Sequence, residues 1–378
     1  MAQVVRGKGA VEPIRRAPTA PGRQDWATWP RYEAAAVGFR EYWYPVTWSR
    51  RVGCKPIQVQ VCGQKVMLIR ERGKAHALHD RCPHRGVPLS HRMARQEFPG
   101  TWSCCYHGWT FDLETGVLVA AITDGPESPI CGKVAVRTYP VEERLGLVFL
   151  WMGDGEPVPI EQDIPEELLD REAIVMGRIT VREGNWRFGA ENGFDDGHAK
   201  YLHRNALWTA RFKMPVWSEM KVIRDGPWIT RRKDKMHYEA EFPGLGKWPP
   251  KKWHKIWQGN KTKVSLRLPG TLRVKYDKWT HFEWWVPTDE QHHIYIQLVH
   301  MNRGRFANFR FSLFYWLYAR WVFHGMFNDE DRLMVEVMDA PPERLYRPDS
   351  SITGWRKLVE EEARYSPTEP KPAATRVE

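Results

Sequence analysis

The chain has 378 residues and a formal net charge of +11, from 57 basic and 46 acidic residues. This length suits two packed domains with a sizeable core better than one. Composition argues against a membrane-spanning protein, because no run of about twenty residues lacks a charge. The most apolar stretch, Phe309–Phe327, is interrupted by arginine and histidine and is expected to be a buried amphipathic helix.

The N-terminal segment Met1–Gln24 is basic and rich in proline and glycine. Its Arg15-Arg16 pair is not followed by the apolar region of an export signal. The six cysteines lack the regular spacing of a secreted disulfide framework, so the thiols are expected to be reduced. We therefore expect a loose N-terminal tail on a cytoplasmic protein.

The positive charge raises nucleic acid as a partner. The densest basic and aromatic run, Gly246–Lys263, interleaves tryptophan with lysine, a pattern that could stack bases and neutralise phosphates. Its prolines and glycines are more typical of a solvated loop that covers apolar side chains. The same charge would also attract an acidic protein.

Short β-type runs separated by turn residues extend from Pro56 to Asp80 and predict an antiparallel meander. The β pattern continues in Gly108–Val119 and in Arg144–Gly153. A polar connector rich in proline and glycine, Gly153–Pro165, is the predicted domain boundary. The predicted organisation is an N-terminal tail and helix (1–38) that packs on the C-terminal domain, an antiparallel β domain (39–153) and the C-terminal domain itself (154–378).

Beyond the connector, strand-like segments mix with helix-like segments, which indicates an α+β domain. A β-hairpin is predicted with its turn at Pro287–Gln291. The histidines at its tip, His292 and His293, are expected to lie on the surface. The following segment, residues 309–339, is predicted to be helical.

Two short loops in the β domain each carry a cysteine and a histidine, as Cys82-x-His84 and as Cys104-x-x-His107. Zinc could accept two thiolates and two imidazoles. A Rieske [2Fe–2S] centre requires each loop to give a sulfur to one iron and a nitrogen to the other. Because each loop is mixed, the pattern favours the Rieske centre. Cys105 stands beside Cys104 and is expected to remain unliganded.

The second domain contains a further group of metal-binding residue types, Asp195, His198 and His203. Two histidines and one carboxylate form the facial triad of mononuclear iron(II) sites. The two histidines are five residues apart, or about 140° around an ideal α-helix, so a regular helix cannot direct both to one ion. The spacing therefore predicts a break or a π-type widening between Ala199 and Leu202.

The motifs resemble those of Rieske non-haem iron ring-hydroxylating oxygenases. Cys-Pro-His-Arg-Gly at Cys82–Gly86 and Cys-x-Tyr-His-Gly-Trp at Cys104–Trp109 are similar to the family's cluster motif. Asn-x-x-Asp-x-x-His-x4-His at Asn192–His203 is similar to its mononuclear iron motif. Similar segments run from Gly38 to Leu358, and within the family they most resemble the carbazole-type terminal oxygenases.

The resemblance assigns roles to individual residues. It implies that His198 and His203 bind the mononuclear iron. It makes Asp195 a bridge that hydrogen-bonds an iron-binding histidine and, across a subunit boundary, a cluster histidine. Asn192, the first residue of the motif, is expected to belong to the same catalytic site. The family ligands of the Rieske [2Fe–2S] cluster correspond to Cys82, His84, Cys104 and His107.

The third iron ligand must come from the segment Met326–Asp339, where Asp329 and Asp331 are both candidates. In the family the ligand aspartate is typically followed by a glutamate five residues later. Asp331 has Glu336 at that distance, so Asp331 is the predicted ligand. An acidic first helical turn favoured by the helix dipole is the alternative explanation of these residues.

The resemblance also implies a fold and an activity. The fold is α+β, with an antiparallel β Rieske domain followed by a helix-grip (TBP-like or START-like) domain around a central antiparallel sheet. The expected protein is a homotrimer that uses O2 and electrons from a ferredoxin. NADH would act only indirectly through a separate reductase, because the chain has no G-x-G-x-x-G fingerprint of its own.

The expected reaction is dioxygenation of an apolar polycyclic aromatic, most specifically conversion of carbazole to 2'-aminobiphenyl-2,3-diol. Other Rieske monooxygenases, of the ketosteroid hydroxylase or O-demethylase type, are the alternatives within the family. From another class, a zinc-containing nucleic-acid-binding protein would explain the charge and the first motif but not the second. The oxygenase interpretation involves neither nucleic acid nor membrane.

Overall fold

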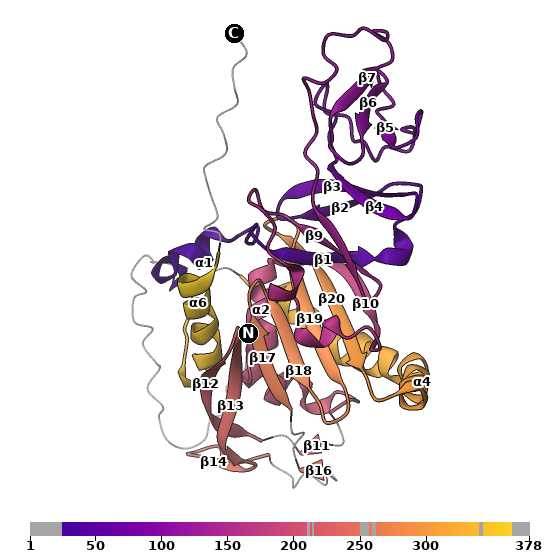
Figure 1. Cartoon of the computed structure of the whole chain (residues 1–378). Helices are drawn as coiled ribbons and strands as arrows, with labels where there is room; N and C mark the ends of the chain where they lie inside the picture. The colour runs from indigo at the N-terminus through magenta and orange to yellow at the C-terminus, as the bar shows by residue number, and fades with distance from the viewer. Residues whose placement is uncertain are drawn as a thin grey trace, which may run out of the picture.

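The computed structural model describes residues 25–209, 212–213, 215–249, 257–258, 262–339 and 343–364. The segment Met1–Gln24, the chain after residue 364 and much of the basic run Gly246–Lys263 lie outside these residues. Figure 1 shows a smaller β-rich part above a larger part built around an extended sheet.

Strands β1–β9 form three antiparallel sheets of three strands each, in the orders β1-β9-β8, β2-β3-β4 and β5-β6-β7. Their bounds are β1 (Trp43–Trp48), β2 (Ile57–Val61), β3 (Gln64–Glu71), β4 (Lys74–His79), β5 (Thr101–Ser103), β6 (Trp109–Asp112), β7 (Leu118–Ala121), β8 (Val141–Arg144) and β9 (Leu147–Trp151). The predicted meander is confirmed as β2-β3-β4. Its two turns place Cys62-Gly63 and Arg72-Gly73 at positive φ, the backbone that two-residue hairpin turns require.

The larger part is organised around a seven-stranded antiparallel sheet in the order β10-β20-β19-β18-β17-β13-β12. Its strands are β10 (Ile174–Glu183), β12 (Trp217–Asp225), β13 (Trp228–His237), β17 (Lys263–Arg267), β18 (Thr271–Lys275), β19 (Thr280–Pro287) and β20 (His292–Met301). The predicted hairpin is confirmed as β19–β20. Two short pairs lie outside this sheet: β11 (Phe212–Lys213) with β16 (Trp257–Gln258), and β14 (Ala240–Phe242) with β15 (Gly246–Trp248). These sheets and the helices around them confirm the α+β class.

Helix α2 (Trp186–Phe194) packs directly against strands β17, β18 and β19 of the central sheet. Its Gly189 and Gly193 are one helical turn apart and both face Trp285 of β19. A Cβ atom at Gly189 would lie 2.1 Å from the Trp285 ring, and one at Gly193 would lie 2.3 Å from it. Because no other residue permits this approach, the two glycines set the position of the helix end that leads to Asp195.

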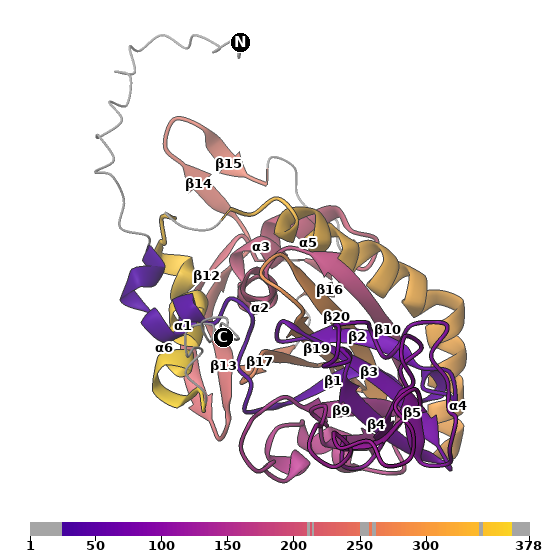
Figure 2. The ribbon, with the colours of Figure 1, turned by 90° about the horizontal axis from the view of Figure 1, so that it is seen from above.

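Two other helical groups flank the sheet. Figures 1 and 2 show α1 (Pro30–Ala34) beside α6 (Ser350–Glu362), so segments far apart in sequence pack together. The backbone N–H of Tyr32 donates to the Glu360 carboxylate at 2.8 Å. Figure 2 shows α4 and α5 along the opposite border of the sheet, where α4 (Arg305–Phe314), the π-helix η6 (Tyr315–Phe327) and α5 (Asn328–Val335) follow one another.

The apolar stretch Phe309–Phe327 is helical, as predicted, but it is not fully buried. Phe323 and His324 are buried, whereas Phe309 and Leu317 are largely exposed. The helix lies on the border of the sheet, so one face packs inward and the other does not. Within the described part of the chain, no helix combines the length and the apolar content needed to cross a bilayer.

The surface position predicted for His293 is wrong. His293 is 1% exposed, and its Nδ1 donates to the Gly184 carbonyl at 2.7 Å, because β20 pairs with β10 up to the hairpin tip. Burial disfavours the charged ring and lowers the pKa of His293 from 6.5 to about 4. The neighbouring His292 is half-exposed and pairs with Asp289 at 2.9 Å.

The buried His293 predicts a pH-dependent loss of stability. The unfolded state takes up a proton on His293 below pH 6.5, whereas the folded state does so only near pH 4. The stability that comes from burying the neutral ring is therefore complete above pH 6.5 and is lost as the pH falls towards 4. Between pH 7.5 and pH 5 it amounts to about 2 kcal/mol in the free energy of unfolding. His293→Asn keeps a donor near Gly184 and should lose less stability over this range, by urea denaturation, than the wild type. His292→Gln is the matched control and should behave as the wild type; equal acid sensitivity of all three proteins would contradict the prediction.

Candidate active site and cluster site

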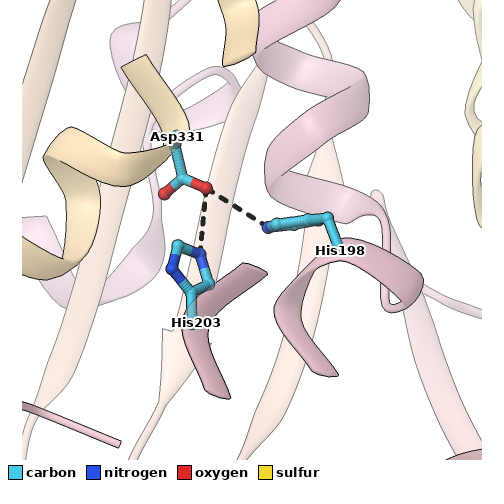
Figure 3. A group of neighbouring side chains, drawn as sticks. All are labelled: His198, His203 and Asp331. Carbon is cyan, nitrogen blue, oxygen red and sulfur yellow. Dashed lines mark ion pairs between the residues drawn. The ribbon is translucent and has the colours of Figure 1, made fainter. Parts of the chain in front are cut away.

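Three side chains from separate elements converge in the larger part of the molecule (Figure 3). His198 lies in α3 (Gly197–Tyr201), His203 in η5 (Leu202–Asn205) and Asp331 in α5. Asp331 Oδ1 lies 3.3 Å from His198 Nε2 and 3.0 Å from His203 Nε2. One ligand atom from each residue lies within 4.8 Å of the others, which suits a single ion bound on one face.

The predicted break between the two histidines is confirmed. The α-helix α3 ends at Tyr201, and the 3-10 helix η5 begins at Leu202. The tighter turn brings the two imidazole rings to a centroid distance of 5.3 Å. A π-type widening, which was the other predicted possibility, is not formed in this segment.

The two imidazoles are oriented by carboxylates on their far side. His198 Nδ1 lies 3.2 Å from Asp195 Oδ2, and Asp195 also accepts the backbone N–H groups of Gly197 and His198. His203 Nδ1 lies 2.7 Å from Glu330 Oε2. Protonation of Nδ1 leaves the Nε2 lone pair of each ring directed at the centre, the arrangement found behind metal-binding histidines.

Asp331 and Asp329 have different partners. Asp331 faces both histidines and accepts the Asn192 side-chain amide at 3.1 Å. Asp329 Oδ1 pairs with Arg178 at 2.7 Å and with Arg182 at 2.5 Å. The structure therefore brings Asn192, Asp195 and Asp331 to the histidines, and it directs Asp329 away.

Glu330 was not among the residues expected from the sequence. It lies in the acidic first turn of α5, between Asp329 and Asp331. The signal available in the sequence was the acidic triplet itself, but the partner of Glu330 is 127 residues away and is set by the fold.

The carboxylates give the centre a strongly negative potential. Burial alone would lower the pKa of His198, but hydrogen bonds with Asp195 and Asp331 raise it to about 9. Burial would likewise raise the pKa of Asp331, but its contacts with the two histidines hold it well below its usual range. A site that favours positive charge this strongly, with two imidazole nitrogens and one carboxylate, fits the donor set of iron(II).

A cavity opens beside this centre, and His198, His203 and Asp331 form part of its wall. Its aromatic and aliphatic lining is Trp208, Val264, Leu272, Val274, Tyr276, Phe323 and Phe327. Polar residues line other sides, including the pair His281 and Glu283 and the cations Arg231 and Lys233 near Asp196. The aromatic wall suits a flat apolar ligand.

The two cysteine and histidine loops of the β-rich part have the same backbone design. Cys82 N–H donates to the Val87 carbonyl at 2.8 Å, and Cys104 N–H donates to the Trp109 carbonyl at 2.8 Å. Four residues after each cysteine, Gly86 and Gly108 adopt positive φ, and their N–H groups return to the carbonyl of the cysteine. Each loop is thereby a tight turn that a residue with a Cβ would strain.

These loops bring their side chains together. Cys82 and Cys104 are buried, and the rings of His84 and His107 lie 4.4 Å apart. The hydrogen bond from the Cys82 thiol lowers the pKa of Cys104, and backbone N–H groups at the loop act in the same direction against burial. Two thiols in hydrogen-bond contact and two neighbouring imidazoles fit the mixed ligand set of a Rieske centre.

Cys105 is separate from this group. Its sulfur lies 3.4 Å from His91 Nδ1, and the side chain is only partly buried. The loop connects β5 to β6, and Figure 1 shows these strands at the end of the molecule distant from the central sheet. The two candidate sites are therefore at different ends of the chain's fold.

Two family comparisons cover most of the chain. Residues 42–140 match the family of Rieske [2Fe-2S] domains, and residues 151–219 and 232–366 match the family of homotrimeric ring hydroxylases. The Rieske match contradicts the alternative of a zinc-binding module.

Individual relatives agree with the families. The terminal oxygenase component of carbazole 1,9a-dioxygenase from Sphingomonas sp is 35% identical over 368 residues, covering 89% of this chain and 95% of that protein. The solved terminal oxygenase of carbazole 1,9a-dioxygenase from Novosphingobium sp. KA1 superposes with a TM-score of 0.81 at 33% identity, covering 91% of this chain and 98% of that one. A reduced complex between oxygenase and ferredoxin in carbazole 1,9a-dioxygenase gives a TM-score of 0.81 at 27% identity, with coverages of 91% and 94%.

The family matches extend over the segments that carry both groups of converging side chains. The relatives are similar over nearly their whole length, so the likeness is not confined to one motif. This chain belongs to the homotrimeric ring hydroxylases that carry a Rieske [2Fe–2S] domain.

Proposed function

We propose that this chain is the terminal oxygenase of a carbazole-type dioxygenase, which adds both atoms of O2 to adjacent carbons of a polycyclic aromatic ring. The observation that carries the proposal is the cavity whose wall combines His198, His203 and Asp331 with aromatic side chains. The relatives named above act on carbazole, and an aromatic wall beside the metal site suits such a flat substrate.

The proposed ligands of the mononuclear iron are His198, His203 and Asp331, and those of the cluster are Cys82, His84, Cys104 and His107. When bound, the cluster supplies single electrons and the iron supplies the oxygen chemistry. Asp195 and Glu330 hold the Nδ1 protons of the two histidines, and Asn192 orients Asp331. The proposed division of the chain is 39–153 for the cluster unit and 154–378 for the catalytic unit, with 1–38 packed on the latter.

Asp195 is also the proposed bridge for electron transfer between subunits. Figure 1 shows the cluster loops and the central sheet at different ends of the fold, so a head-to-tail trimer is the arrangement that would bring one subunit's cluster to its neighbour's iron site. Asp195 contacts His198 with Oδ2 and keeps 18% of its side chain exposed. A histidine of the neighbouring cluster site is the proposed partner of that exposed part.

The proposed electron donor is a ferredoxin, which receives electrons from NADH through a reductase. Solved relatives include a complex of oxygenase with ferredoxin. A net charge of +11 would attract an acidic carrier by electrostatic steering. A cytoplasmic location, where NADH and reduced thiols are both available, completes the proposal.

The proposal is tested by reconstitution of the purified chain with a ferredoxin, a reductase, NADH and carbazole under 18O2. The expected product is 2'-aminobiphenyl-2,3-diol with both hydroxyl oxygens labelled, measured by mass spectrometry. Incorporation of one labelled oxygen would indicate a monooxygenase. NADH oxidation without any oxygenated product would contradict the proposed substrate.

The ligand assignment predicts a selective loss of iron. Asp331→Asn should lower total iron from about three to about two per chain while the Rieske EPR signal is retained. Asp329→Asn is the control: the amide oxygen can still accept hydrogen bonds from Arg178 and Arg182, so the turn keeps its orientation and the third iron, although the weaker pairing should lower Tm. The reverse result, with iron lost in Asp329→Asn and kept in Asp331→Asn, would assign the ligand to Asp329.

Cys104 and Cys105 are adjacent in the chain, so their serine variants form a matched pair that tests which sulfur binds the cluster. Cys104→Ser should abolish the Rieske EPR signal of the dithionite-reduced protein, because the buried thiolate is removed from the loop. Cys105→Ser should leave that signal unchanged, since its sulfur contacts His91 instead. Loss of the signal in both variants, with unchanged far-UV circular dichroism, would show that Cys105 also takes part.

A further inference from the structure

Helix α4 and the π-helix η6 present many large apolar side chains to solvent. The two helices follow one another without a break from Arg305 to Phe327. Phe306 is 75% exposed and Leu317 is 72% exposed, so neither contributes much to the core. The exposed face of α4–η6 is formed chiefly by Phe306, Phe309, Leu313, Trp316, Leu317 and Trp321. Monomeric soluble proteins rarely leave an apolar surface of this kind uncovered unless it binds a partner.

The inner side of the same two helices is apolar as well. Tyr315 and Ala319 pack with Val299 of β20, and Phe323 packs with Trp208. A helix that is apolar on all sides is normally buried in a protein core or in lipid. Figures 1 and 2 show the two helices at the outer border of the molecule, so the fold of one chain covers only their inner side.

The charges on this segment are all of one sign. Residues 303–328 include four arginines and no acidic residue. The Arg320 guanidinium lies over the Trp316 and Trp321 rings, at 5.0 and 5.2 Å from their centroids, and the Arg310 guanidinium lies 5.8 Å from the Phe306 centroid. Both arginines are exposed. The exposed face of α4–η6 therefore combines aromatic side chains with positive charge.

A lipid surface with anionic headgroups would match both features. Phosphate groups attract arginine, while tryptophan, phenylalanine and leucine enter the boundary between headgroups and acyl chains. Basic amphipathic helices commonly lie on membranes in this way. A second copy of this chain could cover the apolar side chains, but it carries the same net charge of +11. The charge therefore favours an anionic lipid surface over a second copy.

The position of η6 connects this face with the aromatic cavity. Phe323 and Phe327 of η6 belong to the cavity wall, whereas Leu317 and Trp321 of the same helix face solvent. One helix would therefore contact lipid on one side and line the cavity on the other. Apolar arenes partition into lipid, so such a position suits an enzyme that takes them as substrates.

We propose that the exposed face of α4–η6 is a peripheral binding surface for membranes with anionic phospholipid headgroups. The contact lies in the plane of the interface and requires no membrane-spanning helix. It revises the expectation, drawn from the resemblance, that the oxygenase involves no membrane. The inference goes beyond the proposed function and does not depend on which arene is oxidised.

The test is flotation of the purified holoprotein with vesicles of equal parts phosphatidylglycerol and phosphatidylcholine, compared with vesicles of phosphatidylcholine alone. At low ionic strength the wild type should bind the anionic vesicles about tenfold or more tightly. The binding should weaken as added salt screens the arginines. Absence of binding to the anionic vesicles, or equal binding to both kinds, would overturn the inference.

Two variants of the exposed face separate its apolar and charged parts. Phe309→Ser combined with Leu317→Ser should lower binding to the anionic vesicles about tenfold, because two apolar anchors are lost. Arg320→Glu should lower it about fivefold or more, because a cation near the headgroups is replaced by an anion. Wild-type binding in both variants would contradict the assignment of this face.

The matched controls lie on other parts of the surface. Leu245→Ser removes an apolar side chain that is 89% exposed in the turn between β14 and β15. Lys357→Glu makes the same change of charge as Arg320→Glu, but on α6, across the sheet from α4. Both controls should bind the anionic vesicles as the wild type does, and a loss equal to that of the two variants would overturn the inference.

Iron content and the Rieske EPR signal verify that each variant is loaded and folded, and light scattering gives its oligomeric state. If Phe309→Ser with Leu317→Ser dissociated the trimer, the face would be a contact between copies and the lipid assignment would be wrong. The 18O2 reconstitution described above contains no vesicles. Its product is therefore independent of lipid binding, and failure of the proposed function is distinguishable from failure of this inference.

Discussion

The active site depends on how the first turn of α5 is fixed to the central sheet. Asp329 pairs with Arg178 and Arg182 of β10, and these contacts hold the turn in one orientation. In a helix each side chain has a set direction relative to its neighbours. Once Asp329 is held in place, the directions of the other side chains in the same turn are therefore fixed as well. Asp331 is thereby directed at the two histidines, and Asn328 is directed at Glu283.

The opposite side of the site is positioned by close packing. Gly189 and Gly193 let α2 lie directly on Trp285, and α2 leads into Asp195 and the broken helix of the two histidines. On β19, alternate residues share a face of the sheet. His281, Glu283 and Trp285 are such a set, so one strand both supports α2 and lines the cavity.

The cluster site is built on a different principle. Its ligands come from two short loops with the same hydrogen-bond pattern, each closed by a glycine at positive φ. Such loops fix a cysteine and a histidine through local backbone geometry, and contacts between the loops add to it, since the His84 ring stacks on Trp109 at 4.8 Å. The active site, by contrast, is assembled from carboxylates and imidazoles that belong to separate elements. The buried carboxylates of the active site pair with its imidazoles. Because these charges need no further partner from the aromatic cavity, the cavity stays free for a substrate.

The sequence alone determined what depends on local spacing. Mixed Cys-x-His and Cys-x-x-His loops indicated a Rieske centre, and the five-residue interval between His198 and His203 predicted the helix break, because both follow from backbone geometry over a few residues. The meander, the hairpin and the α+β class also followed from periodicity. The family spacing had favoured Asp331 over Asp329, and the structure places Asp331 on the histidines. Tertiary structure alone decided that Glu330 orients His203, that His293 is buried, and that Glu283 lies in the cavity. Each of these contacts joins residues far apart in the chain, and their meeting depends on the packing of the central sheet, which local spacing does not encode.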